Sequence, residues 1–371
     1  MRSRRIATAT TLVTAATAVW AGAGSPDATA GGPGEAIVAD VNGDGRPDRV
    51  VLGLAVGPTG TRCHLAVSLG LPGGDFGTPQ TYVFLTLPAD EPNCPDMEVG
   101  LDLDADPAAE LALTWSAGPP TTVDNTLLVL DDFAVSAGFD TIFQPSFIGT
   151  ADFDGDGRQD VYEWTDQGEG FATYLATGLG TLVPGPVRHC SGPLTHRLAD
   201  FDRDDAMDVV IAYIEGCADY FSGVVVVRDD SSQLHLHTDV EGFASWTVET
   251  GDANSDGLVD VITHNELTDE TTTFIGLGNG DFVRSPVAIR DYPTVPGNKA
   301  TGIRVVANDY ASNRAKVSIW TPPRYGTVKV TTDGTVIYTP NPVHGRSDRF
   351  VYRLSEDGRT SNATVSLKII D

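Results

Sequence analysis

The chain has 371 residues, with 51 acidic side chains against 24 basic ones and a formal net charge of −27. Hydrophobic residues make up 41% of it, which supplies a real core and argues against disorder along the whole chain. Such an acidic chain excludes a general nucleic-acid binder, because phosphate contacts need clustered Lys and Arg.

The N-terminus has the pattern of an export signal. A cationic patch from Arg2 to Arg5 precedes an apolar, Ala/Thr-rich run to about Ala23, and Ala28-Thr29-Ala30 resembles a small-residue cleavage site. We therefore predict a signal peptide over residues 1–30 and a secreted, extracellular protein. A membrane anchor is the alternative, although the run is short and rich in Thr, and no later apolar run is long enough to span a bilayer.

The four cysteines are an even number, which in an exported chain predicts two disulfides. Three pairings are possible, and we favour Cys63 with Cys94 and Cys190 with Cys217, because these close loops of similar length. A zinc site is the rival interpretation, but no C-x-x-C spacing exists.

A nine-residue acidic pattern recurs five times, and it begins at Asp40, Asp102, Asp152, Asp200 and Asp252. Periods of about 50 residues are typical of propellers and arrays. A short β-rich run such as Val209-Val210-Ile211 follows each copy, and no sustained helical period appears from residue 31 onward. The predicted fold class is all-β, with five blades of about four strands each.

These residues resemble the FG-GAP/VCBS repeats of the integrin-α-like β-propellers. The shared features are the Asp-rich loop, the β-run after it and a later turn such as Leu277-Gly-Asn-Gly-Asp-Phe282. The resemblance implies a β-propeller over residues 31–290. The family commonly has seven blades, whereas this chain has room for five, so closure into a ring is left open.

Side-chain oxygens stand at positions 1, 3, 5 and 9 of each copy, and position 7 can add a backbone carbonyl. A hard divalent cation that takes six to eight oxygens suits this donor set, and calcium suits it best. Turns alone do not require acids at four fixed offsets. EF-hand and dockerin loops lead into helices, whereas strands are predicted here. We predict about four Ca²⁺ sites, with ligands Asp40, Asn42, Asp44, Arg46 and Asp48; Asp152, Asp154, Asp156, Arg158 and Asp160; Asp200, Asp202, Asp204, Ala206 and Asp208; and Asp252, Asn254, Asp256, Leu258 and Asp260.

The residue at position 6 of each copy indicates how well its loop should bind a metal ion. Three copies have Gly there, which allows positive φ, and the copy at Asp200 has Asp205, which tolerates left-handed geometry better than most residues. The copy at Asp102 has Pro107, whose φ is fixed near −65°. We therefore expect that loop to be metal-free or weak.

The charge balance changes near residue 298. Residues 31–298 have a net charge of −34 and residues 299–371 have +5. Alternating runs such as Thr335-Val-Ile-Tyr338, together with a hairpin signal at Asp333-Gly334, predict strands. With Val306-Ala307-Asn308-Asp309 and Tyr338-Thr339-Pro340, this segment resembles the cadherin-like or Ig-like repeats of bacterial adhesins, which implies a β-sandwich over residues 291–371.

Known catalytic motifs are absent from the sequence. His235 and His237 are expected on one strand face, as a solvated pair rather than a metal site. Trp115, Trp164 and Trp246 are expected in the core rather than exposed for sugar stacking. The predicted function is an adhesion or binding module for an extracellular glycan or protein. The alternatives are a polysaccharide-active hydrolase or lyase that uses acids on the propeller face, and a purely structural surface protein.

Overall fold

The computed structural model describes residues 35–88, 93–104, 106–116, 126–142, 144–165, 170–191, 193–217, 220–239 and 244–370. The predicted signal peptide lies outside these residues. Within them, no helix is long and apolar enough to cross a membrane.

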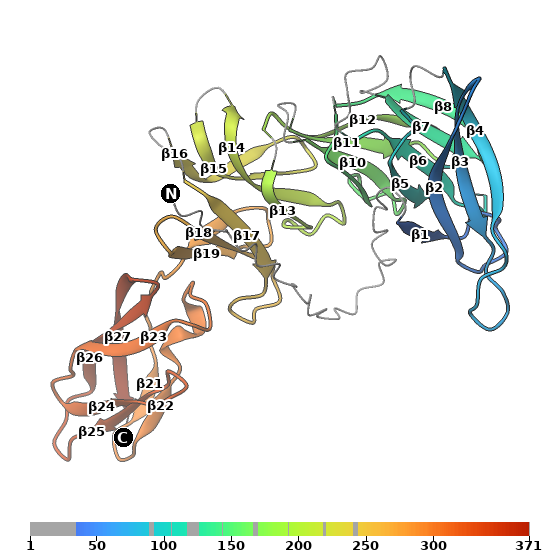
Figure 1. Cartoon of the computed structure of the whole chain (residues 1–371). Helices are drawn as coiled ribbons and strands as arrows, with labels where there is room; N and C mark the ends of the chain where they lie inside the picture. The colour runs from blue at the N-terminus through green and yellow to red at the C-terminus, as the bar shows by residue number, and fades with distance from the viewer. Residues whose placement is uncertain are drawn as a thin grey trace, which may run out of the picture.

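Five four-stranded antiparallel sheets follow one another along the chain, and each has its strands in sequence order (Figure 1). The first two sheets contain β1 (Ala36–Ala39), β2 (Asp48–Gly57), β3 (Gly60–Ser68) and β4 (Gln80–Leu87), then β5 (Met97–Leu101), β6 (Glu110–Thr114), β7 (Thr126–Asp131) and β8 (Ala134–Asp140). The third and fourth contain β9 (Phe147–Ala151), β10 (Asp160–Trp164), β11 (Phe171–Ala176) and β12 (Leu182–His189), then β13 (Pro193–Ala199), β14 (Asp208–Cys217), β15 (Tyr220–Val227) and β16 (Gln233–Asp239). The fifth contains β17 (Trp246–Gly251), β18 (Asp260–Asn265), β19 (Glu270–Gly276) and β20 (Phe282–Arg284). This confirms the all-β prediction and the five blades.

Each acidic loop connects the first and second strands of its sheet, and the β-rich run after it forms the second strand. The ninth residue of each copy is the first residue of that strand, as with Asp160 at the start of β10. The repeat therefore places one acidic loop at the same corner of every blade.

Buried side chains join each blade to the next. One cluster joins blades 1 and 2, and it contains Leu65 and Leu113; a second joins blades 2 and 3. A third cluster, with Phe153 and Tyr213, joins blades 3 and 4, and a fourth, with Trp246, joins blades 4 and 5. In the described part of the chain no buried cluster joins blade 5 to blade 1, and Figure 1 shows these two sheets at opposite ends of the row. The five blades thus form an open array.

Backbone hydrogen bonds from one blade to the acidic loop before it reinforce these contacts. Two of them come from position 8 of the next loop: the N–H of Ala109 donates to the carbonyl of Asp40 at 2.7 Å, and that of Met207 to the carbonyl of Asp152 at 2.8 Å. In the first loop position 8 is Pro47, which has no N–H to donate. The first blade is therefore unsuited to make this bond to a blade preceding it.

The C-terminal residues form a two-sheet sandwich. One sheet has the order β21-β27-β26-β23 and the other β22-β25-β24. Their core contains Tyr338, Phe350 and Tyr352, all fully buried. The elements are β21 (Thr294–Pro296), β22 (Thr301–Ile303), the 3-10 helix η1 (Val305–Asn308), β23 (Lys316–Thr321), β24 (Gly326–Val330), β25 (Val336–Pro340), β26 (Ser347–Glu356) and β27 (Arg359–Ile370).

The sandwich contacts blade 5 at its acidic loop. The N–H of Asn313 donates to the carbonyl of Ala253 at 2.7 Å, and its side-chain amide donates to the Ser255 hydroxyl at 2.9 Å. Arg314 reaches Thr273 on β19 with a bond of 2.9 Å. The sandwich thus makes a contact with the fifth loop of the kind that a following blade makes elsewhere.

Candidate functional site

The ninth residue of each copy anchors its acidic loop. Asp160 is fully buried, and its two carboxylate oxygens accept the N–H groups of Phe153 and Ala176, both at 2.7 Å. The first bond closes the loop and the second fixes the end of the third strand. The same pair of bonds is made by Asp48, Asp208 and Asp260, with donors Val41 and Gly70, Phe201 and Asp229, and Ala253 and Gly276.

The first aspartate of each intact copy organises the turn. Oδ2 of Asp152 accepts the N–H of Gly157 at 2.8 Å, and Oδ1 accepts that of Gly155 at 2.8 Å. Position 6 has positive φ in all four intact copies, including 74° at Asp205. The prediction that Asp205 adopts left-handed geometry is therefore confirmed. Its N–H makes the equivalent bond to Asp200 Oδ2 at 3.1 Å.

Position 4 also has positive φ in these copies, which the sequence analysis missed. The angles are 69° at Gly43, 69° at Gly155, 68° at Arg203 and 66° at Ser255. Gly at this position in two of the four copies was the available signal, because glycine adopts this conformation without steric cost.

Carboxylates converge in three of the five loops. Asp152, Asp154 and Asp160 each place an oxygen within 4.8 Å of the others, and Asp200, Asp202 and Asp204 do the same. Oxygen donors at this spacing suit a hard cation such as Ca²⁺, and without one the carboxylates repel each other. The amides of Asn42 and Asn254 stand at position 3 of the first and fifth loops, where they accept the N–H groups of Asp44 and Asp256 at 2.9 and 3.0 Å.

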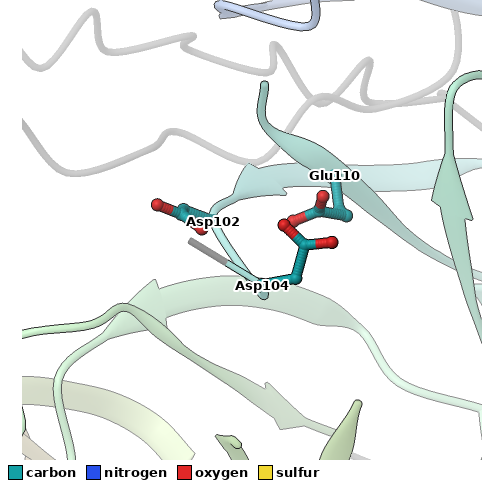
Figure 2. Close-up of side chains that lie close together, drawn as sticks. All are labelled: Asp102, Asp104 and Glu110. Atoms are coloured by element: carbon teal, nitrogen blue, oxygen red, sulfur yellow. The ribbon is translucent and has the colours of Figure 1, made fainter. Parts of the chain in front are cut away.

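The third convergent group is Asp102, Asp104 and Glu110, in the loop that we expected to be metal-free or weak (Figure 2). Figure 2 shows the Asp104 and Glu110 carboxylates close together, with Asp102 to one side. Glu110 accepts the N–H of Leu103 at 2.6 Å, as the ninth-position aspartates do in the other loops. Pro107 cannot donate the position-6 bond to the first aspartate, because it has no N–H. The relative weakness of this loop stays a prediction.

Burial raises the pKa values of four ninth-position acids, those of the second to fifth loops. The pKa is about 7 for Asp160 and Asp208, and about 6 for Asp260 and Glu110, although the backbone N–H bonds lower it in each case. These acids therefore bind protons more readily than ordinary carboxylates. A cation among them would compete with those protons.

One further acid lies close to the fourth loop. Burial raises the pKa of Asp229, and the carboxylate of Asp204 adds to the shift. Asp229 follows β15, so it comes more than twenty residues after the loop. Only the three-dimensional structure places it there.

The buried tryptophans confirm the core-packing expectation. Trp115 is 2% exposed and its indole N–H donates to the carbonyl of Asn93, while Trp246 is 5% exposed and donates to Asp239. Trp164 is half-buried and stacks with Phe147. None of the three presents a largely exposed ring on which a sugar could stack.

The expectation that His235 and His237 share a strand face was wrong. A register shift between Val224 and Val225 opposite these histidines breaks the alternation of β16. His237 stacks on Trp246 and its Nε2 lies 2.9 Å from Thr263 Oγ1 in blade 5. His235 is close enough to His189 in blade 3 to affect its pKa.

The Cys63–Cys94 disulfide is present, with its Cα atoms 5.4 Å apart, as predicted. It ties β3 to the segment that leads into the second blade. The side chain of Cys217 lies outside the described part of the structure, so its pairing with Cys190 stays a prediction.

Comparisons with known proteins agree with this architecture. A family model described as an FG-GAP-like repeat matches residues 152–211, which include the third and fourth acidic loops. A model described as a bacterial Ig domain matches residues 284–369. The chain therefore carries an FG-GAP-like repeat and a C-terminal bacterial Ig domain, which confirms both resemblances at that level. The cadherin-like description stays a prediction.

No curated protein matches the sequence significantly. Among solved structures, the chain is similar to an endo-fucoidan hydrolase of glycoside hydrolase family 107, at 12% identity and a TM-score of 0.20. The match covers 93% of this chain and 44% of that one. A similarity this low carries no conclusion about fold or activity.

Proposed function

We propose that the chain is a secreted calcium-binding protein that attaches to an extracellular glycan or protein through its blade array. The observation that carries the proposal is the recurrence of one oxygen-rich loop at the same corner of every blade. A cation in each loop would neutralise the clustered carboxylates and fix the turn, so that the loops of neighbouring blades present a defined surface. The Cys63–Cys94 disulfide and the Ig domain favour an extracellular setting.

Thermal unfolding of the mature chain with Ca²⁺, and after chelation and dialysis, tests the calcium part. Binding to the native state alone stabilises by about 2.7 kcal/mol per site at a hundredfold excess over the dissociation constant. We expect a large fall in Tm on removal of calcium, with only partial recovery in Mg²⁺, which keeps its own waters. An unchanged Tm, together with no bound calcium by elemental analysis, would refute it.

A glycan array and a panel of extracellular matrix proteins, probed in calcium buffer, test the attachment part. Binding that disappears with the chelator supports the proposal. Turnover of a polysaccharide instead of binding would favour the hydrolase or lyase alternative. If neither binding nor turnover is detected, the remaining alternative is a structural role at the cell surface.

A further inference from the structure

The Ig domain has one sheet face that carries an unusual set of exposed side chains. In the β21-β27-β26-β23 sheet, side chains alternate between the core and the outer face. Phe350, Tyr352 and Leu354 of β26 point into the core, so Arg349 and Arg353 lie on the outer face. The strand register places Ser366 beside Arg349 and Asn362 beside Arg353. We call this outer face, with Lys316, Trp320, Arg349, Arg353, Lys368 and Tyr292, the basic sheet face.

Trp320 presents an exposed indole ring on this face, and Arg353 contacts it. It is 57% exposed and stands at a bulge of β23, between Ile319 and Thr321. The guanidinium carbon of Arg353 lies 3.5 Å from the centre of its ring, and Nε of Arg353 donates to Asn362 Oδ1 at 2.9 Å. The amide therefore holds the guanidinium over the indole, in a cation–π contact that leaves much of the ring accessible.

A second exposed ring lies at the other edge of the sheet. Tyr292 is 72% exposed and comes directly after Asp291, which bridges to Val365 of β27. Three interstrand steps of about 4.8 Å separate the β21 edge from β23, so the backbones that carry the two rings are about 14 Å apart. Arg349 and Ser366 lie between them.

The positive charge of the basic sheet face is not matched by acids. Among the described residues of the sandwich, Asp348 and Glu356 are buried, and Asp309 accepts the hydroxyl of Tyr352 in the interior. Asp291 is half-buried and pairs with the core residue Val365, which puts its side chain on the core side of the sheet. Asp357 pairs with Arg314 at the hairpin next to blade 5, and Asp333 lies in the turn between β24 and β25 on the other sheet. Lys316, Arg349, Arg353 and Lys368 make no ion pair within the described part of the chain.

We propose that the basic sheet face binds an acidic polysaccharide, a linear chain of sugar rings bearing carboxylate or sulfate groups. Exposed rings stack on the apolar faces of sugars, and the cations between them match anionic substituents along the polymer. The face is an open sheet surface with an aromatic ring at each edge, which suits an extended polymer of sugar rings better than a folded acidic peptide. This inference goes beyond the calcium loops and does not depend on their occupancy.

The test is a titration of the full mature chain, in calcium buffer at physiological salt, with dextran sulfate and with unsulfated dextran of the same length. We expect dextran sulfate to bind and dextran to bind at least about tenfold more weakly, since it lacks the anionic groups. Trp320→Ala should weaken dextran sulfate binding by roughly tenfold, because it removes the stacking ring and releases Arg353. Arg349→Ala should weaken it by roughly fivefold.

Lys329→Ala is the matched control. Lys329 is an exposed cation of β24 on the opposite sheet, so its removal changes the net charge equally and should alter binding by less than about twofold. Far-UV circular dichroism and Tm identify any variant that fails to fold, and Trp320→Phe, which keeps a ring, should retain most of the binding.

Several outcomes would overturn the proposal. Equal losses for Lys329→Ala and Arg349→Ala would mean diffuse charge attraction. Binding of polyglutamate or duplex DNA as tight as that of dextran sulfate, and insensitive to Trp320→Ala, would mean a charge surface without sugar stacking. Loss of binding in chelator, at a temperature where the fold persists, would place the site on the calcium loops instead. Absence of binding to dextran sulfate would refute it directly.

Discussion

Glu98 is a carboxyl group buried between the first two blades, and its removal should stabilise the protein at neutral pH. It is fully buried in β5, and burial raises its pKa to about 8, although a hydrogen bond with the backbone of Leu52 lowers it. In the unfolded chain the same group ionises near pH 4.5. The folded state therefore keeps the proton over a pH range in which the unfolded state releases it.

The sign and size of the effect follow from this difference. Below pH 4.5 both states are protonated and Glu98 has no pH-linked effect on stability. As the pH rises from 4.5 to about 8, the unfolded state is favoured progressively, and the free energy of unfolding falls by about 3 kcal/mol by pH 7. Glu98→Gln removes the ionisation and keeps the shape. We expect its stability relative to wild type to rise by about 2 kcal/mol between pH 5 and pH 7.

The assay is thermal or denaturant unfolding of both proteins at the two pH values, with saturating calcium. Taking the difference between variant and wild type at each pH cancels the titration of the acidic loops, because both proteins share them. A gain of 2 kcal/mol corresponds to a Tm shift of roughly 4–8 °C for a domain of this size. The same difference at pH 5 and pH 7 would refute a buried, proton-bearing Glu98.

Three further predictions concern the blades. Asp156→Ala should remove one bound calcium ion by elemental analysis, whereas Asp106→Ala should remove almost none; equal losses would contradict the ranking by Pro107. Reducing the Cys63–Cys94 bridge, or replacing both residues by Ser, should lower the free energy of unfolding by about 4 kcal/mol for a 31-residue separation, measured in urea. Asp205→Val should cost at least about 1 kcal/mol, because a β-branched residue resists the positive φ, while Asp205→Gly should cost little; similar losses in both would show that the side chain, not the backbone, matters there.

Much of the fold could be predicted because the repeat encodes it locally. In each copy, the residues from position 1 to position 9 predict a loop, and the residues after them predict a strand. Five copies therefore predict five sheets. The left-handed turn at Asp205 followed from position alone. The general preference of large aromatic side chains for the core was enough to predict the burial of Trp115 and Trp246.

Features that depend on distant partners left no local signal. The bulge that separates His235 from His237 is a mismatch with β15, which an alternating sequence does not reveal. Asp229 approaches the fourth loop only because the third strand ends there. The convergence of Asp102, Asp104 and Glu110 persists beside Pro107 because Glu110 is held by the N–H of Leu103.

The contact between Asn313 and the fifth loop bears on how such a protein can change in length. In a closed ring, the number of blades is restricted to the number that completes the circle. Here, within the described part of the chain, buried clusters join each blade only to its neighbours along the chain, and the sandwich contacts the fifth blade. Duplication or loss of a whole inner blade would leave the first blade and the contact with the sandwich intact, and would make the array longer or shorter without a closure requirement.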